Sequence, residues 1–415
     1  MKALFRDATV FDSGVIKKAD MLLDGTTLSA FVGEVSAIDP SIPVFDNIAI
    51  LPGFCDVHVH LREPGFSYKE TMATGTCAAA RGGYTCVLSM PNLNPTPDSR
   101  ESLEVQLRRI REDAVISVLP YGTITKGECG LELSDMGDMA ESVAGFSDDG
   151  RGVQSEEMML RAMELAARLG KPIVAHCEDN SLLRGGYIHD GEYAAAHGHR
   201  GICSESEWGP IKRDLELVKR SGCAYHVCHI STKESVELIR KAKAEGVNVT
   251  CETAPHYILL DDSCLMEDGR FKMNPPLRSK EDREEILRGI IDGTIDAIAT
   301  DHAPHSAEEK SRGLEKSAMG VVGIETAFPL VYTYLVKPGI ISLERAVELL
   351  SLAPRRRFGI DSDVGFSVWR LGESKPIDPG DFLSKGKSTP FLGTPVEAEC
   401  LVTVYQGKAV YSSLS

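Results

Sequence analysis

Residues 50–65 read "ILPGFCDVHVHLREPG", an apolar run that ends in two histidines and an arginine. Short apolar runs bounded by polar residues are typical of buried strands in a parallel sheet. Seven similar runs follow: "YTCVLSM", "VISVLPY", "VAGFSDD", "PIVAHCED", "AYHVCHIS", "NVTCET" and "DAIATDH". Eight such strands alternating with helices predict an α/β protein with a (β/α)8 TIM-like barrel, whose active site lies at the carboxyl ends of the strands.

The same opening stretch argues against a doubly wound sheet. That fold would place a glycine-rich dinucleotide fingerprint after the first strand, where this chain has "HLREPG". Segments with helical periodicity separate the predicted strands or follow the last one. They span residues 69–81, 98–112, 134–142, 154–169, 205–221, 231–245, 280–292, 325–335 and 343–352.

Short β-like runs with turns occupy both ends of the chain, as in "ALFRDATVF" and "AECLVTVYQGKAVY". We therefore expect a small β-sandwich domain built from both termini. The predicted division is residues 1–50 and 356–415 for the small domain and 51–355 for a metal-dependent barrel.

Composition narrows the class of protein. The chain has 61 acidic and 45 basic residues and a net charge of -16, which argues against general affinity for nucleic acid or an anionic membrane. No apolar run reaches the roughly 18 residues that span a bilayer, and the opening residues lack the apolar core of a signal peptide. Eleven cysteines without framework spacing favour reduced thiols. We expect a cytoplasmic protein.

Metal-ligand residue types occur at five of the eight strand ends. His58 and His60 point to the same side of their strand, as does Asp56, because side chains alternate. The other candidates are Asp148, Asp149, His176, His229 and Asp301. Each alone is as easily a polar residue at a strand end, but together they predict one or two divalent ions of the zinc type. By alternation, Cys177 and Cys228 face away and are expected to pack. His226 differs in parity from His229 and is expected either in the core or in contact with a ligand.

The chemistry that follows is hydrolysis of an amide or cyclic amide. A metal lowers the pKa of bound water and polarises a carbonyl, and Asp301 is placed to move the proton to the leaving nitrogen. His305 lies on the following loop. Arg62 offers a fork suited to a carboxylate, and Asn92 and Asn274 could bond a carboxylate or amide edge, although asparagine beside proline is also ordinary turn chemistry.

These motifs resemble the dihydroorotase family of the amidohydrolase superfamily. The matching segments run in order over nearly the whole chain: "DVHVHLREPG", "MPN", "FSDDG", "VAHCED", "CHIST", "MNPPLR" and "ATDHAPH". The resemblance implies zinc-dependent, reversible cyclisation of N-carbamoyl-L-aspartate to (S)-dihydroorotate plus water in de novo pyrimidine (UMP) synthesis. It also implies a homodimer and an association with aspartate transcarbamoylase.

The resemblance assigns the family's residue roles to the matching positions of this sequence. The implied zinc ligands are His58, His60, Asp149, His176, His229 and Asp301, with Asp301 also the catalytic acid/base. The implied substrate contacts are His60, Arg62, Asn92, Asn274, His305, Met319 and Gly320. Residues 303–320 resemble the loop that closes on substrate.

Two departures and two rival functions remain open. "GFSDDGRG" has no lysine to bridge two metals, so an aspartate would bridge, and "VGFSVWRLGESKPID" departs from the usual pattern of the small domain.

A hydantoinase or allantoinase would share the barrel, but resembles the chain less because such enzymes normally carry that lysine and lack the arginine of "HLRE". An inactive dihydroorotase-like partner of aspartate transcarbamoylase would have lost ligands, and here every position is filled.

Overall fold

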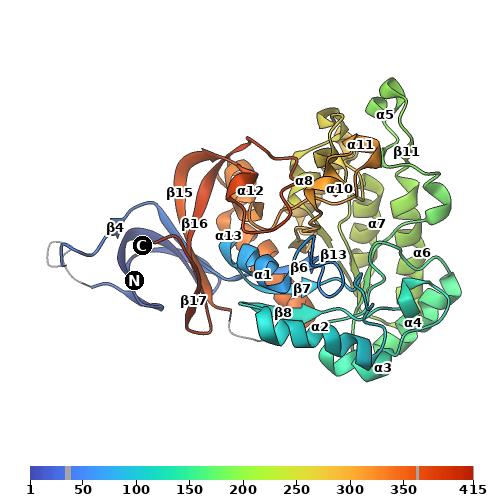
Figure 1. The fold of residues 1–415 in the computed structure, drawn as a ribbon, viewed down its shortest axis with the longest axis horizontal. Coiled ribbons are helices and arrows are strands. Elements are labelled where there is room, and N and C mark those ends of the chain that lie inside the picture. The colour runs from blue at the N-terminus through green and yellow to red at the C-terminus, as the bar shows by residue number, and fades with distance from the viewer. Residues whose placement is uncertain (33–38, 361–363, 415) are drawn as a thin grey trace.

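The computed structural model describes residues 1–32, 39–360 and 364–414, which form a barrel and a smaller sheet (Figure 1). Seven barrel strands are present: β6 (Phe54–Val59), β7 (Tyr84–Ser89), β8 (Ser117–Pro120), β9 (Ile173–Ala175), β12 (Tyr225–Val227), β13 (Val249–Thr253) and β14 (Ala297–Ile298). All their pairings are parallel, in the orders β6-β7-β8 and β14-β13-β12-β9. The predicted alternation of parallel strands and helices is confirmed.

Single bridges join these two sheets into a ring. Phe146 bridges both Gly122, just after β8, and Ile173 of β9, so it occupies the fourth strand position. Val59 of β6 bridges His302, just after β14, and closes the barrel. The strand predicted at "VAGFSDD" is thus correct in place but too long. It ends early because the Asp148 carboxylate accepts the backbone N–H groups of Ile124 and Thr125, at 2.8 and 3.0 Å, and draws the chain out of the ladder.

Helices cover the outside of the barrel. The helices that follow successive strands are α1 (Met72–Arg81), α2 (Arg100–Asp113), α3 (Met136–Met139) with η3 (Ala140–Ser142), α4 (Glu156–Leu169), α6 (Glu205–Ser221), α7 (Lys233–Ala244) and α9 (Lys280–Asp292). After β14 come α12 (Ala327–Val331), η7 (Tyr332–Val336), α13 (Leu343–Val347), η8 (Glu348–Leu352) and α14 (Ala353–Phe358).

Capping side chains set where these helices begin. The helix expected from residue 69 starts at Met72, because Thr71 accepts the Thr74 N–H and the Glu63 carboxylate accepts the Met72 N–H at 2.8 Å. Ser155 likewise caps α4 through the Met158 N–H, two residues later than expected. By contrast, α6 and α9 have the predicted bounds, 205–221 and 280–292.

Several short elements were not predicted. They are η2 (Lys126–Glu128), η4 (Asn180–Leu182), β10 (Ile188–His189), α5 (Glu192–His197), β11 (Gly201–Ile202), α8 (Pro255–Leu259), η5 (Asp262–Cys264), η6 (Gly269–Phe271), α10 (Ala307–Lys310), α11 (Gly313–Lys316) and η9 (Pro379–Asp381). Among them, α5 and β11 project from the barrel at the end of the molecule away from the small sheet (Figure 1). Each is too short to show a period in the sequence.

Strands from both termini form one eight-stranded sheet, and the two chain ends lie together in it (Figure 1). Its strands are β1 (Lys2–Asp12), β2 (Val15–Asp24), β3 (Thr27–Ala30), β4 (Val44–Phe45), β5 (Ile48–Pro52), β15 (Phe366–Pro376), β16 (Pro395–Tyr405) and β17 (Lys408–Ser412). The halves meet where β5 pairs in parallel with β1 and antiparallel with β15. The domain limits predicted at 50/51 and 355/356 fall within β5 and α14, and that division stays a prediction.

Aromatic packing joins the sheet to the barrel. Trp369 of β15 is buried, with its ring centroid 4.5 Å from that of Phe328 in α12 and 6.0 Å from that of Phe54 in β6. Buried aromatic pairs of this kind stabilise a joint between two layers. The small sheet therefore braces the first barrel strand, which carries His58.

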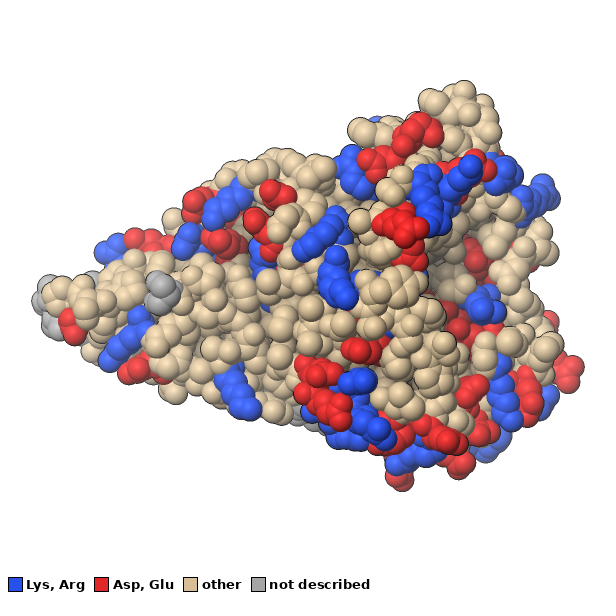
Figure 2. Space-filling view, viewed as in Figure 1, with Lys and Arg blue, Asp and Glu red and all other residues tan. Residues whose placement is uncertain are grey.

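The surface carries mixed charge. On the face shown in Figure 2, acidic and basic side chains are interspersed over the barrel helices. Within the part of the chain that the structure describes, no helix combines the length and the apolarity that crossing a membrane requires.

Candidate metal centre

The six expected metal ligands lie together at the carboxyl ends of the barrel strands. None has more than 6% of its surface exposed. They are His58 in β6, His60 just after it, Asp149 after the Phe146 bridge, His176 after β9, His229 after β12 and Asp301 after β14. His60 Nε2 lies 3.1 Å from Asp301 Oδ1, and His58 Nε2 lies 3.4 Å from Asp149 Oδ1. Residues up to 243 positions apart in the sequence thus share one cluster.

Backbone conformation helps to aim these side chains. His229 and Asp301 have φ values of 30° and 45°, and Arg62, just beyond His60, has 60°. Non-glycine residues seldom adopt this left-handed region, and such strain concentrates at functional sites. The three residues stand where the chain turns out of a barrel strand into a loop.

Asp149 stands between two pairs of imidazoles. Its Oδ1 lies 3.4 Å from His58 Nε2 and 3.6 Å from both His176 Nδ1 and His229 Nε2. Its Oδ2 lies 3.5 Å from His60 Nε2. Two sets of potential ligands share this carboxylate: His58, His60 and Asp149, and Asp149, His176 and His229. The arrangement fits a carboxylate that bridges two ions.

Unpartnered polar atoms support the fit to a metal. His58 Nε2, Asp149 Oδ1, His176 Nε2 and His229 Nδ1 are buried without a hydrogen-bond partner. Buried polar groups left unpaired are costly, and a cation would satisfy those that face the cluster. Mixed imidazole and carboxylate donors suit zinc and similar divalent ions.

The cluster is held by strong mutual electrostatics. Burial works against ionisation of Asp149 and Asp301, yet the surrounding imidazoles outweigh it. The pKa of Asp149 lies well below its usual value, and the pKa of Asp301 is lowered to about 2, chiefly by His60 and His58. Burial would lower the pKa of His176, but Asp149 and Glu178 raise it to about 10. Both of these carboxylates, which are expected ligands, are therefore ionised at neutral pH.

Glu252 on β13 orients one of the expected ligands, His58, through a hydrogen bond to its ring. Its Oε1 accepts from His58 Nδ1 at 2.6 Å, and its Oε2 accepts from His226 Nε2 at 3.0 Å. Partners of this kind fix the tautomer and direction of a metal-binding histidine. The sequence analysis did not single out Glu252; the available signal was an acid inside the apolar run "NVTCET". His226 takes the supporting position that its strand parity indicated.

Asn92 plays a similar part for His60. Its Oδ1 accepts from His60 Nδ1 at 2.9 Å, and its Nδ2 lies 3.4 Å from Asp149 Oδ2. The expected substrate contact thus also bonds two of the expected ligands. With Nδ1 occupied, His60 presents Nε2 to the cluster.

Two other acids at the strand ends serve the fold. Asp56 accepts from Thr300 Oγ1 at 2.6 Å and from the Thr300 N–H, so its carboxylate ties β6 to the chain after β14. Burial raises the pKa of Asp56 to about 7. Asp148 holds Ile124 and Thr125, as described above. Asp56 was expected on the same side of the strand as the two histidines, and its carboxylate there is engaged by Thr300 and the His58 N–H.

The expected substrate contacts line the same cavity, which has a volume of about 220 Å³. Its walls include the ligands His60, Asp149, His176, His229 and Asp301 and the side chains or backbone of Arg62, Asn92, Asn274, His305, Met319 and Gly320. Arg62 Nε donates to the Pro304 carbonyl at 3.1 Å, and its Nη2 lies 3.4 Å from His305 Nε2, so the guanidinium stands beside His305. Asn274 Nδ2 donates to Glu178 Oε1 at 2.8 Å, a second acid that the sequence analysis did not single out.

Gly320 is required by close approach. Its φ is 132°, and a Cβ there would lie 2.8 Å from the Ala303 carbonyl oxygen and 3.1 Å from His305 Nε2. The backbone of this loop can therefore lie against His305 only with glycine at this position.

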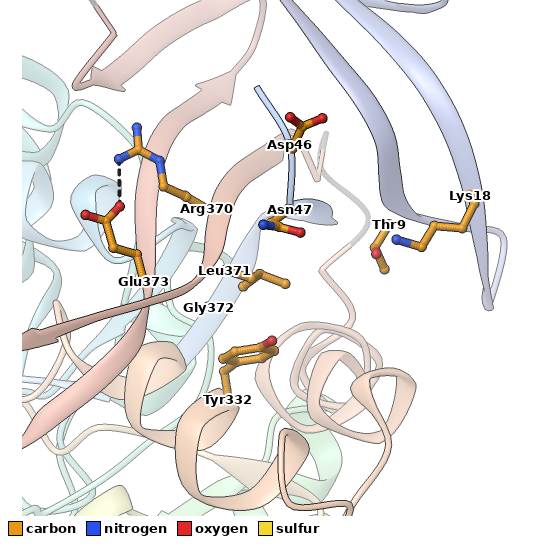
Figure 3. A pocket seen from close by; sticks show the side chains of 9 residues that line it. All are labelled: Thr9, Lys18, Asp46, Asn47, Tyr332, Arg370, Leu371, Gly372 and Glu373. Atoms are coloured by element: carbon orange, nitrogen blue, oxygen red, sulfur yellow. Dashed lines mark hydrogen bonds and ion pairs between the residues drawn. The ribbon is translucent and has the colours of Figure 1, made fainter. Parts of the chain in front are cut away.

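A larger hollow, of about 640 Å³, lies elsewhere, between the small sheet and η7 (Figure 3). Its charged side chains pair with acids or bases close by: Arg370 with Glu373 at 3.3 Å, and Asp46 with Arg6 at 2.7 Å. It brings together no imidazole or thiol. The cavity above the barrel strands is the candidate site.

Comparison with known proteins gives the family. A family model described as dihydro-orotase-like matches residues 48–235. A dihydroorotase of Fusobacterium nucleatum is 48% identical over 98% of this chain and 98% of its own length. A dihydroorotase of Shouchella clausii is 51% identical over 88% of this chain and 87% of its own.

Solved structures agree on the fold. The L-hydantoinase (dihydropyrimidinase) of Arthrobacter aurescens superposes with a TM-score of 0.83 at 25% identity, covering 99% of this chain and 96% of its own. The dihydropyrimidinase of Brevibacillus agri gives a TM-score of 0.81 at 23% identity, covering 99% and 95%.

Proposed function

Because this chain belongs to the dihydroorotase family, we propose that it catalyses the reversible cyclisation of N-carbamoyl-L-aspartate to (S)-dihydroorotate plus water. The chain is a hydrolytic cyclic amidase in fold and relationship. The observation that supports the specific reaction is one cavity lined both by the imidazoles and carboxylates of the cluster and by Arg62. The reaction supplies pyrimidine synthesis.

We assign the metal to zinc, held by His58, His60, Asp149, His176, His229 and Asp301. When bound, zinc lowers the pKa of a coordinated water and polarises the carbonyl to be attacked. Asp149, shared by both ligand sets, would bridge two ions, and no lysine stands in that position. Glu252 and Asn92 keep His58 and His60 turned toward the cluster.

Asp301 is the proposed acid/base. It is ionised at neutral pH, and its Oδ1 lies 3.1 Å from His60 Nε2. In hydrolysis of the ring it accepts a proton from the attacking water and returns it to the leaving ring nitrogen, so the amide C–N bond breaks with a neutral leaving group. In cyclisation the same proton moves in reverse.

Arg62 and its neighbours are proposed to hold the substrate carboxylate. A guanidinium binds a carboxylate in two parallel hydrogen bonds. The remaining proposed substrate contacts are His60, Asn92, Asn274, His305 and the backbone of Met319 and Gly320. Asn274 Oδ1 is buried without a partner, which suits a donor on the substrate.

A direct comparison of substrates tests this function. Turnover of dihydroorotate, dihydrouracil and allantoin is measured with the same zinc-loaded preparation, and zinc content is measured alongside. We expect turnover of dihydroorotate alone at an appreciable rate, because only its ring carries a carboxylate for Arg62. Preference for an uncharged ring would instead indicate a hydantoinase or allantoinase.

Assembly and location stay predictions. We propose a homodimer, an association with aspartate transcarbamoylase beside catalysis, and a cytoplasmic setting. All eleven cysteines are unpaired, which supports a reducing compartment.

A further inference from the structure

Lys69 stands beside the candidate site although nothing in the proposed chemistry requires it. It lies in the loop between β6 and α1, and its side chain is 14% exposed. Its Nζ lies 3.3 Å from His305 Nδ1 and 2.9 Å from Glu309 Oε1. It also lies over the rings of Phe66 and Tyr68, at 5.5 and 5.6 Å from their centroids. A lysine so enclosed is fixed in position.

The proton on His305 can be placed from its partners. His305 Nε2 lies 2.8 Å from the Met319 carbonyl oxygen. A carbonyl only accepts and a guanidinium only donates; the carbonyl contact is much the shorter, since Arg62 Nη2 lies 3.4 Å from the same nitrogen, so Nε2 carries a hydrogen. Burial, and then the charges of Arg62, Lys69 and Lys310, lower the pKa of His305 to about 3. The ring is therefore neutral, and Nδ1 has a free lone pair.

Two groups compete for that Nδ1 atom. Lys69 Nζ can only donate to it, whereas Glu309 Oε2, at 3.5 Å, can only accept from it. Glu309 is already engaged: Oε2 accepts from the N–H and hydroxyl of Ser306 at 3.0 and 3.1 Å, and Oε1 pairs with Lys69. The lysine thus excludes the other tautomer, in which Nδ1–H would bond Glu309 and Nε2 would be a bare acceptor.

We propose that Lys69 is a positioning residue that holds His305 as the Nε2–H tautomer, so that the imidazole faces a substrate carboxylate beside Arg62 with its N–H and not with a lone pair. His305 Nε2 lies 3.4 Å from Arg62 Nη2, and both line the cavity. The opposite tautomer would direct a lone pair at the carboxylate and repel it. This inference rests on the proposed function, because it needs an anionic substrate.

The test compares three variants of the zinc-loaded, full-length enzyme in dihydroorotate hydrolysis. Lys69→Met removes the donor and keeps the length of the side chain. Lys69→Arg keeps a cationic donor. Glu309→Gln keeps an acceptor for Ser306 but breaks the ion pair with Lys69, so it is the matched control for a purely structural role.

We expect Lys69→Met to raise KM about tenfold or more, the worth of a charge-assisted hydrogen bond, with kcat changed by less than about threefold. Lys69→Arg and Glu309→Gln should stay within about threefold of wild type in KM, a range well below the loss of such a bond. Equal losses in Lys69→Met and Glu309→Gln would overturn the proposal, because they would assign the effect to the ion pair.

A double-mutant cycle covers the case in which one variant is poorly folded. In a His305→Ala background, Lys69→Met should add less than about twofold to KM, because the residue through which it acts is gone. A further tenfold rise would overturn the role. A wild-type enzyme that does not hydrolyse dihydroorotate would overturn the proposed function as well, whereas turnover with an unaffected Lys69→Met overturns the role of Lys69 alone.

Discussion

Replacing Glu252 by glutamine should weaken metal binding as well as the fold. Glu252 is completely buried and joins His58 Nδ1 to His226 Nε2 at 2.6 and 3.0 Å. Burial opposes its ionisation, but His58 and His226 lower the pKa of this carboxyl below its usual value. Glutamine has the same shape and can still accept from His58 and donate to His226, whose other nitrogen bonds Thr250 Oγ1 at 2.8 Å. The hydrogen bonds survive, and the negative charge is lost.

The magnitude follows from that single loss. A residue that supports a metal ligand contributes about 10- to 100-fold to metal affinity, which corresponds to about 1.4–2.7 kcal/mol. Loss of a charge-assisted hydrogen bond costs the metal-free protein about 1.5–3 kcal/mol of unfolding free energy. Zinc affinity is measured by competition with a chelator, and stability by urea unfolding of the metal-free protein.

Asp214→Asn is the control. Asp214 is also a buried carboxylate, paired with Arg213 Nε at 2.7 Å and Tyr225 OH at 2.8 Å, but it contacts none of the proposed ligands. It should lose similar stability and keep wild-type zinc affinity. Unchanged zinc affinity in Glu252→Gln, or an equal loss in Asp214→Asn, would refute the assignment of Glu252 as the group that orients His58.

Three further predictions concern catalysis, binding and pH. Asp301→Asn should lower kcat by about 10²- to 10⁴-fold in steady-state hydrolysis of dihydroorotate, because the amide cannot carry the proton; a fall below tenfold would contradict the role. Arg62→Lys should raise KM about tenfold and change kcat less, since one point charge replaces the fork; equal effects on both would argue against carboxylate binding. Burial, and then Asp148 and Asp149, raise the pKa of Glu128 to about 8 from 4.5. The folded state then binds more protons than the unfolded state between these values, so Glu128 costs stability as pH rises through that window. Glu128→Gln should remove this loss, by at most about 5 kcal/mol at pH 8 in urea unfolding; equal pH dependence in both proteins would contradict it.

The barrel and the clustering of the candidate ligands could be predicted because both signals are local. Apolar runs such as that of β6 mark the strands, and a ligand type directly after a run marks the carboxyl end, so His58, His176 and Asp301 were accessible one strand at a time. The parallel topology then brings these ends together without further information. Helices as long as α6 and α9 could also be predicted, because apolar residues repeat with a period of 3.6 over three or more turns.

The supporting residues could not be predicted in the same way. Glu252 acts on His58, which lies 194 positions away in the sequence, and nothing in "NVTCET" indicates that the two residues are in contact. Lys69 lies in a charged loop where an exposed lysine is the usual expectation. Short elements such as α5 and α10 depend on tertiary contacts, because a single turn of helix is not stable alone. In each case the missing information is the long-range contact itself.

The distribution of charge around the cavity favours one orientation of the proposed substrate. Asp149 and Asp301 lie among the imidazoles of the cluster, whereas Arg62 and Lys69 lie beside His305. A substrate carboxylate placed among the imidazoles would meet two acids in a site of low dielectric, whereas beside His305 it would meet the charge of two cations. Its amide carbonyl would then face the proposed metal site and Asp301. In the proposed reaction the arginine and the lysine would therefore do more than add affinity, because they would determine which end of the molecule reaches the reacting groups.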